Sequence, residues 1–290
     1  MENKSQHWIP RSYLEPWCDS NRVPANAEPY VWYFPKKGGA GKRKSPHNLF
    51  EDSDFYTILT ADGQRDLSLE DGLAILESRF RPIRSLVEAR QPISDRDRVW
   101  LCGFVAAMHW RTRSQRDAFR QQWGHVVTIA EDLQQALNRM TPRQRQEHQP
   151  ITPLGATTGP SLTVDDARRL SAQPLQHMLL TAIEEDLRLL AQMNLVVFTT
   201  DDDLGFITSD HPCAYFDPDG GRRPPMLQSR TIEVTLPISP RSLLLLSWED
   251  FPPYRTAALP EVDNANRLQS IACAEYVVVR RDETKPVWFT

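Results

Sequence analysis

The sequence predicts an α+β fold with an N-terminal strand-containing segment, a central bundle of about three long helices and a C-terminal, mainly antiparallel sheet. Three observations support this prediction. Short aromatic strand patterns occur within residues 1–60, apolar residues recur every three or four positions through residues 68–194, and short β-rich runs bounded by turn residues fill residues 195–290. We expect the three parts to form a single α+β domain over residues 1–290, with residues 1–60 as N-terminal anchor and strands.

The N-terminal part contains two predicted strands with a basic loop between them. Tyr30–Phe34 (YVWYF) and Asp54–Leu59 (DFYTIL) have the composition of strands. The loop Lys36–Ser45 is rich in glycine and carries five cationic residues. It does not match a phosphate-binding P-loop, because Lys36 stands where the motif needs glycine and Arg43 where it needs serine or threonine. The loop predicts either a local basic patch that contacts nucleic acid or a nucleotide, or simply a solvated loop.

The central part contains the predicted long helices. Leucine, phenylalanine and isoleucine recur at helical spacing over residues 68–83. A second helix should begin near Ser94; its stretch VWLCGFVAAMHW is apolar nearly all round, which indicates a buried helix that the following polar stretch continues. Thr163 with Asp166 resembles a capping box at the start of the third long helix. We expect Arg139–Pro160 to be a long surface loop.

The C-terminal part has the short apolar and β-branched runs that are typical of a sheet. Turn residues bound each run, and we expect a helix over residues 261–273 between the last two strands. The predicted strands carry the sequences LVVFTT, GFITSD, CAYF, TIEVTLP, LLLLS and EYVVVRR.

Composition and charge exclude several classes of protein. The chain has 290 residues with 34 Lys plus Arg against 38 Asp plus Glu, so it lacks the overall cationic field that attracts nucleic acid. It begins without the apolar core of a signal peptide, and its densest apolar run, Leu243–Leu246, is too short to span a bilayer. We therefore expect a cytoplasmic, soluble protein with no membrane contact. The four cysteines form no CxxC pair, which favours buried free thiols.

Two places in the sequence bring ionisable side chains close together. His109 ends the apolar helix and Arg111 follows it, an arrangement that suits anion binding or proton transfer. A core histidine that bonds a backbone carbonyl is the structural alternative. At the strand end Thr208–His211 (TSDH), a carboxylate and an imidazole stand together, which suits a metal or acid–base site. The alternative there is a turn in which Ser209 and Asp210 satisfy their own backbone.

Glu77 is a further acidic candidate, because of its place on the first predicted helix. It lies beside Leu76 and Phe80, which belong to the apolar stripe, so its carboxylate can point into a cleft. Pairing with Arg81 on the surface is the alternative. The sequence therefore leaves open whether Glu77 is a site residue or a solvated one.

Well-known catalytic motifs are missing from the sequence. It contains no G-x-S-x-G nucleophile elbow and no H-E-x-x-H metal motif. Asp210 followed by Glu233 has the order of a restriction-type nuclease core, but the lysine that should follow the glutamate is absent. A motif therefore identifies no reaction.

Segments spread over the chain share the motifs of one family. They are His7–Pro10 (HWIP) with Tyr13–Leu14, Arg111–Thr112, Phe206–Pro212 (FITSDHP), Leu236–Pro240 (LPISP) and Asn264. From residue 6 to about residue 280, the chain resembles the uncharacterised, mainly microbial family defined by a His-Tyr-Val-Pro motif, domain of unknown function 4238. Trp8 and Ile9 depart from the motif but keep an aromatic and a β-branched residue. His211 stands where the family more commonly has asparagine.

The resemblance implies a shared fold but no established reaction. A family defined by its first histidine implies that the N-terminal segment docks into the body of the protein, with the apolar anchors within Tyr13–Trp17. We therefore expect His7 to meet the strand end Thr208–Asp210 and the helix end at His109 and Arg111. The expected pocket consists of His7, Asp210, Glu77 and Arg111.

Two classes of function fit these residues. The first is a metal-dependent, nuclease-like hydrolase of phosphodiesters, because imidazole and carboxylate ligands bind Mg or Mn while a guanidinium holds phosphate. The second is a non-catalytic binding or regulatory module that recognises a nucleotide or peptide anion with the same groups. The predicted catalytic residues are His7, Asp210 and Glu77, the metal ligands are His7 and Asp210, and the substrate-binding residues are Arg111, His109, Ser209 and Thr208.

Overall fold

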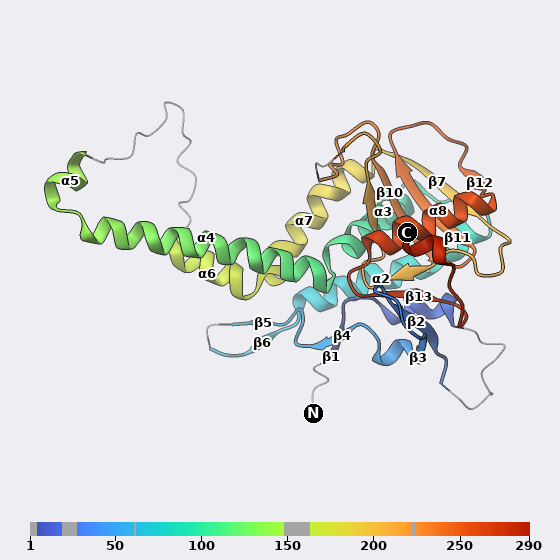
Figure 1. Ribbon diagram of the computed structural model, residues 1–290, viewed down its shortest axis with the longest axis horizontal. Helices are drawn as coiled ribbons and strands as arrows, with labels where there is room; N and C mark the ends of the chain where they lie inside the picture. Colours follow the sequence, from blue (N-terminus) through green and yellow to red (C-terminus); the bar gives the residue numbers. More distant parts are fainter. Residues whose placement is uncertain (1–4, 19–27, 61, 148–162, 222–223) are drawn as a thin grey trace.

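Figure 1 shows the arrangement of the chain in the computed structural model, which describes residues 5–18, 28–60, 62–147, 163–221 and 224–290. The α+β class is confirmed: N-terminal strands precede the long helices α2 to α4, and a mostly antiparallel sheet follows them. The organisation as one domain stays a prediction.

The N-terminal part consists of short strands and single helical turns. In chain order they are β1 (Ser5–His7), α1 (Arg11–Leu14), η1 (Glu15–Trp17), β2 (Val31–Pro35), β3 (Lys42–Lys44), η3 (Pro46–Asn48), β4 (Glu51–Ser53), β5 (Ile58–Leu59) and β6 (Arg65–Asp66). β1 pairs with β4 and β2 with β3, both antiparallel. The first expected strand is confirmed as β2. Only the end of the second is a strand, because Phe55 and Tyr56 turn into the core.

The central part is helical, with breaks that the sequence did not predict. Its helices are α2 (Ser68–Glu88), α3 (Asp95–Trp110), α4 (Arg113–Arg139), α5 (Pro142–Glu147), α6 (Val164–Ala172) and α7 (Pro174–Leu190). α3 begins where expected, since the Ser94 hydroxyl accepts from the Asp97 N–H at 3.1 Å. The polar stretch does not continue α3. The Thr112 hydroxyl caps a new helix, α4, by accepting from the Gln115 N–H at 3.4 Å.

The third predicted helix is also divided. The capping box of Thr163 and Asp166 is confirmed, but it starts α6, and α7 begins separately at Pro174. A proline lacks the N–H that would continue the preceding helix, and it is favoured in a first turn. The loop expected at Arg139–Pro160 contains α5, and its residues 148–160 lie outside the described residues. Figure 1 shows α4 extending away from the sheets with α6 beside it.

Two sheets complete the fold. Their remaining elements are β7 (Asn194–Thr199), β8 (Thr208–Ser209), β9 (Ala214–Phe216), β10 (Glu233–Ser239), β11 (Ser242–Ser247), β12 (Tyr254–Thr256), α8 (Leu259–Ala272), β13 (Tyr276–Val279) and η4 (Pro286–Phe289). One sheet has the order β12-β7-β11-β10-β9 and is antiparallel except between β12 and β7. The other, in the order β3-β2-β13-β8, joins the last strand to N-terminal strands. α8 confirms the expected late helix.

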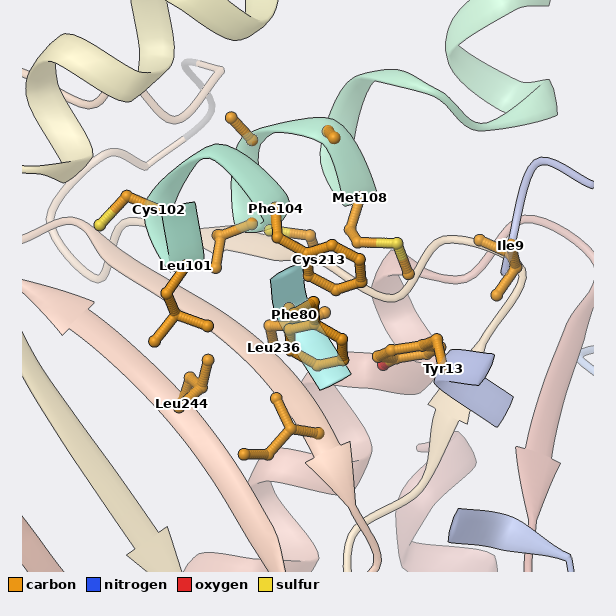
Figure 2. Packing of buried hydrophobic residues seen from close by; sticks show 14 of the residues in the cluster. Ile9, Tyr13, Phe80, Leu101, Cys102, Phe104, Met108, Cys213, Leu236 and Leu244 are labelled. Atoms are coloured by element: carbon orange, nitrogen blue, oxygen red, sulfur yellow. The ribbon is translucent and has the colours of Figure 1, made fainter. Parts of the chain in front are cut away.

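The main core lies between α2, α3 and the inner face of the five-stranded sheet. Phe80 of α2 and Phe104 of α3 stack with their ring centroids 3.7 Å apart. Figure 2 shows Tyr13 beside this pair of rings and Leu236 and Leu244 below α3. Burying one such side chain contributes about 1.5 to 3 kcal/mol. α3 is buried over most of its second half, as the sequence predicts, and this places the helix at the centre of the core.

The N-terminal segment is anchored by buried aromatic side chains. Tyr13 and Trp17 are 0% exposed. The Tyr13 hydroxyl donates to the carbonyl of Pro237 at 2.6 Å, so the Thr208 hydroxyl, at 2.8 Å, donates to the Tyr13 oxygen. Trp17 Nε1 donates to the carbonyl of Phe206 at 2.9 Å. These bonds attach the start of the chain to β8, to β10 and to the residues before β8.

The cysteines have the reduced form that the sequence predicts. All four are free, and Cys102, Cys213 and Cys273 are buried. Burial raises the pKa of Cys102 to about 11, which keeps this thiol protonated at neutral pH. In the part of the chain that the structure describes, no helix combines the length and the apolarity that crossing a membrane requires.

Tyr13→Phe is expected to lower the free energy of unfolding by about 1 to 3 kcal/mol, because it leaves a buried carbonyl and a buried hydroxyl without their partner. Urea denaturation measures the change. Tyr30→Phe is the control, since the Tyr30 hydroxyl makes no hydrogen bond with a described residue, and it should leave stability unchanged. Equal stability of Tyr13→Phe and wild type would show that the anchor acts through apolar packing alone.

Candidate functional site

Two of the hollows that the N-terminal segment borders are considered as candidate sites because together they contain His7, Glu77, Arg111 and Asp210. The first, which we call the polar cavity, has a volume of about 280 Å³ and contains three of the four residues that the sequence placed in one pocket. The second, which we call the aromatic cleft, has a volume of about 390 Å³ and contains the fourth. The polar cavity is lined chiefly by His7, His47, Glu51, Glu70, Glu77 and Arg111, and the aromatic cleft by Trp8, Tyr33, Lys44, Phe50, Arg113, Asp210 and Tyr276.

Arg111 is buried at the end of α3 and links the walls of the polar cavity. It donates from Nη1 to Glu77 at 2.7 Å, from Nη2 to the carbonyl of His7 at 2.8 Å and from Nε to the Tyr56 hydroxyl at 3.1 Å. Burial alone would lower the pKa of Arg111, but Tyr56 and Glu77 outweigh burial and raise it. The guanidinium is thus engaged with the protein itself, and its role as a phosphate ligand stays a prediction.

His7 is half-buried at the rim of the polar cavity. Its Nε2 donates to the carbonyl of His47 at 2.8 Å and lies 3.9 Å from a carboxylate oxygen of Glu51. Burial lowers the pKa of His7 below its usual 6.5, which keeps the imidazole neutral at pH 7. A neutral imidazole and the carboxylate of Glu77 therefore border the same cavity.

Asp210 lies in the aromatic cleft, where backbone N–H groups occupy its carboxylate. Oδ1 accepts from Ala274 at 2.9 Å, and Oδ2 accepts from Glu275 at 2.7 Å and from Tyr276 at 3.2 Å. Burial nevertheless raises the pKa of Asp210, because desolvation of the carboxylate outweighs the three donors. The side chain holds the start of β13 against the end of β8. The sequence also allowed a turn in which Asp210 bonds its own backbone, whereas the backbone that it bonds here is at the start of β13.

Thr208 and Ser209 are both 0% exposed and bonded within the fold. The Thr208 hydroxyl contacts Tyr13, as described above. The Ser209 hydroxyl accepts from the His211 N–H at 3.0 Å and from Gln269 Nε2 at 2.7 Å. Their predicted role as substrate ligands remains a prediction.

His109, which is half-buried, and His211, which is buried, form a pair of neighbouring rings. The His109 ring stacks on Tyr215 at 3.9 Å, and its Nδ1 donates to the carbonyl of Cys213 at 3.4 Å. The His211 ring lies 5.2 Å from that of His109, and its Nδ1 is 3.0 Å from the Ser114 hydroxyl. Burial lowers the pKa of His109 to about 3 and that of His211 to about 4. His109 thus has the contacts of the core alternative, a carbonyl-bonded histidine.

Four of the predicted site residues divide between the two hollows, and His109, Thr208 and Ser209 border neither. His7, Glu77 and Arg111 border the polar cavity, Asp210 borders the aromatic cleft, and Glu51 borders both. Within the described ranges, no group of three or more His, Cys, Asp or Glu side chains is placed to hold a metal ion. The metal pair of His7 and Asp210, with Mg or Mn, therefore remains a prediction without a cluster of ligands around it.

The sequence did not predict which residues form the walls of the aromatic cleft. Tyr33 of β2 and Tyr276 of β13 pack edge to face with centroids 5.3 Å apart, and Lys44 and Arg113 border the same space. Strand periodicity could have placed Tyr33 and Lys44 on one face, because their strands alternate with a period of two. The pairing of β2 with β13 has no signal in the local sequence, so the second tyrosine could not have been placed.

The basic loop has both structural and solvent-facing cations. Lys36 Nζ donates to the carbonyls of Ile271 at 2.7 Å and Cys273 at 2.6 Å, which closes the C-terminal end of α8. The Arg43 guanidinium lies 5.6 Å from the ring of Trp32, on the opposite face of the strand from Lys44. Only Lys44 of these three cations borders the aromatic cleft.

One protein family matches nearly the whole chain. The model of the family described as protein of unknown function (DUF4238) matches residues 5–283. The chain belongs to the DUF4238 family. The matched residues include every residue that lines the polar cavity and the aromatic cleft, so both hollows lie within the DUF4238 region. Neither the curated proteins nor the solved structures contain a match.

The pair of His109 and His211 should make this DUF4238 protein less stable in acid. The unfolded chain takes up protons near pH 6.5, whereas the folded pKa values are about 3 and about 4. Between pH 6.5 and 4 the unfolded state therefore binds more protons, and the free energy of unfolding falls as pH falls. His211→Asn should remove its share of this slope, about 1.4 kcal/mol per pH unit. Urea denaturation at a series of pH values measures it.

Asparagine suits this test, because its amide can bond the Thr112 and Ser114 hydroxyls near the present imidazole. His125→Asn, at an exposed position of α4, is the matched control and should leave the pH slope as in wild type. A wild-type slope in His211→Asn would contradict the assignment of acid sensitivity to the histidine pair.

Proposed function

We propose that this protein binds a nucleotide, or another aromatic molecule that carries phosphate, in the aromatic cleft. This is the binding alternative that the sequence left open, with a different set of residues. The proposal rests on one observation: a single cleft combines aromatic side chains with two cations that have no carboxylate partner among the described residues. A nucleobase can stack on the aromatic side chains, and a phosphate can pair with the two cations.

Four aromatic residues border the cleft: Trp8, Tyr33, Phe50 and Tyr276. The Nε1 of Trp8 is buried and has no hydrogen-bond partner within the described part of the chain. Such an unpaired buried donor costs about 1 to 3 kcal/mol. A ligand that brings an oxygen or a ring nitrogen to Trp8 would remove this cost, and a flat ring is the shape that tyrosine and tryptophan walls accommodate.

Lys44 and Arg113 supply the positive charge. Lys44 extends from β3, and Arg113 lies in the first turn of α4 with its guanidinium 5.9 Å from the ring of Trp8. Neither makes a hydrogen bond or an ion pair with a described residue, whereas Arg111 and Arg116 are paired with carboxylates. Both cations are therefore available to an anion in the cleft.

The N–H groups at the start of α4 also favour the binding of an anion in the cleft. Ser114 lines the cleft, and the N–H groups of Arg113 and Ser114 belong to the first turn, where a helix leaves its N–H groups without an internal partner. The helix dipole also places partial positive charge at this N-terminal end of α4. Helix starts of this kind bind phosphate and other anions.

Four carboxylates border the cleft; three of them have partners, and the fourth, Glu275, has none among the described residues. Asp210 accepts three backbone N–H groups, Asp117 contacts Arg116 at 3.0 Å, and Glu51 is bonded to the Ser5 hydroxyl. These contacts reduce the repulsion that an entering phosphate would meet.

Adenosine monophosphate is expected to raise the melting temperature more than equal concentrations of adenosine or inorganic phosphate, because it alone engages both the aromatic walls and the cations. Lys44→Gln and Arg113→Gln should each weaken its binding about fivefold to tenfold, since each removes a charged contact. Isothermal titration calorimetry measures the dissociation constants, and the binding of adenosine should not change.

Lys42→Gln is the matched control, since Lys42 is an exposed lysine of the same strand that does not border the cleft. It should bind adenosine monophosphate as wild type does. The proposal is contradicted if Lys42→Gln loses as much affinity as Lys44→Gln, or if inorganic phosphate binds as tightly as the nucleotide.

A second proposal keeps phosphodiester hydrolysis and places it in the polar cavity. It is favoured by the neutral imidazole of His7 and the carboxylate of Glu77, which border one cavity beside Arg111. Nδ1 of His7, the nitrogen that does not donate to His47, would take a proton from a water molecule as the water oxygen attacks phosphorus. As the bond between phosphorus and the leaving oxygen breaks, the imidazolium would give its proton to that oxygen or to solvent. Mg or Mn enters this proposal only as an added ion.

Release of p-nitrophenolate from bis(p-nitrophenyl) phosphate in the presence of Mg or Mn tests the second proposal. His7→Gln should lower the rate by about 100-fold or more, the usual effect of losing a general base. His125→Gln, at an exposed position of α4, should keep the wild-type rate. The hydrolase proposal fails if wild type releases no product with either ion, or if His7→Gln retains the full rate.

A further inference from the structure

A third hollow lies on the outer face of the five-stranded sheet, opposite the helical core. This outer pocket has a volume of about 350 Å³, within the range that holds small-molecule ligands. None of its lining residues borders the polar cavity or the aromatic cleft. It is lined chiefly by Phe198, Phe206, Glu233, Leu243, Leu245 and Phe251.

The pocket exists because β11 is apolar on both faces. Leu244 faces the main core, while Leu243 and Leu245 alternate to the outer face. α8 covers part of that face, where Val262 packs in one cluster with Phe206 and Leu243. The remaining apolar surface forms the walls of the pocket, and a ligand with an apolar body would fill it.

Glu233 is the charged group of the pocket that lacks a partner among the described residues. It stands at the start of β10, half-buried, and its carboxylate makes no hydrogen bond or ion pair with a described residue. Burial, with a smaller effect of Glu249, raises the pKa of Glu233. A carboxylate that has lost water without gaining a donor is stabilised by any cation or N–H that a ligand brings.

The other charges of the pocket cancel. Arg255 donates to the carboxylate of Glu261, and its guanidinium lies 5.4 Å from the ring of Phe198. This pair leaves the carboxylate of Glu233 as the remaining charge among the residues that line the pocket. The pocket therefore favours a positively charged ligand over a neutral or negative one.

We propose that the outer pocket binds a small molecule with an apolar body and one ammonium group, with the ammonium against Glu233. The body would pack on Leu243, Leu245 and Phe251, and the ammonium would donate to the carboxylate that has no other donor. This site is independent of the function proposed for the aromatic cleft, since the two share no residue.

Hexylammonium, hexanol and hexanoate test the proposal, because they share a tail and differ in charge. Isothermal titration calorimetry should show the tightest binding for hexylammonium. Glu233→Gln should weaken hexylammonium about tenfold, the effect of losing one charged hydrogen bond, and leave the binding of hexanol unchanged. Ala265→Phe, which places a ring in the pocket, should weaken all ligands that bind there.

Glu249→Gln is the matched control, because Glu249 is a nearby exposed carboxylate that does not line the pocket. It should bind hexylammonium as wild type does. The proposal is overturned if hexylammonium does not bind, if hexanoate binds as tightly, if Ala265→Phe leaves hexylammonium binding unchanged, or if Glu249→Gln loses as much affinity as Glu233→Gln.

Discussion

The buried guanidinium of Arg111 is the interaction on which the arrangement of the N-terminal segment depends. It stands where α3 ends, and its three contacts join the backbone of β1, the carboxylate of Glu77 on α2 and the hydroxyl of Tyr56. Breaking such a buried pair costs about 3 to 5 kcal/mol, because the remaining charge has no water around it. Separation of β1 from the helices would take away one of the three acceptors of this buried cation, the carbonyl of His7.

The docked N-terminal segment forms a wall of the polar cavity and a wall of the aromatic cleft. His7 and Trp8 are neighbours in the chain, yet His7 borders the polar cavity and Trp8 the aromatic cleft. Tyr13 and Trp17 fix the same segment to the sheets from the other side. The large and rigid side chains at the start of the chain thus form part of two surfaces that the central helices and sheets could not build alone.

The chemistry of the candidate site depends more on environment than on residue type. Asp210 and His211 have the side chains of acid–base catalysts, but three N–H groups occupy the first and burial keeps the second neutral. Lys44 and Arg113, which carry no motif, are cations without a carboxylate partner in the described structure. Sequence alone identifies which groups can ionise, and the surrounding atoms decide which of them face a ligand.

The sequence by itself determined the α+β class, the buried α3 and the caps at Ser94 and Thr163, because periodicity and capping act between residues a few positions apart. Only the tertiary structure decided that β13 pairs with β2, which sets Tyr276 beside Tyr33 and Asp210 in the aromatic cleft. Those contacts join distant parts of the chain, and their register depends on the packing of whole sheets, for which no local pattern exists.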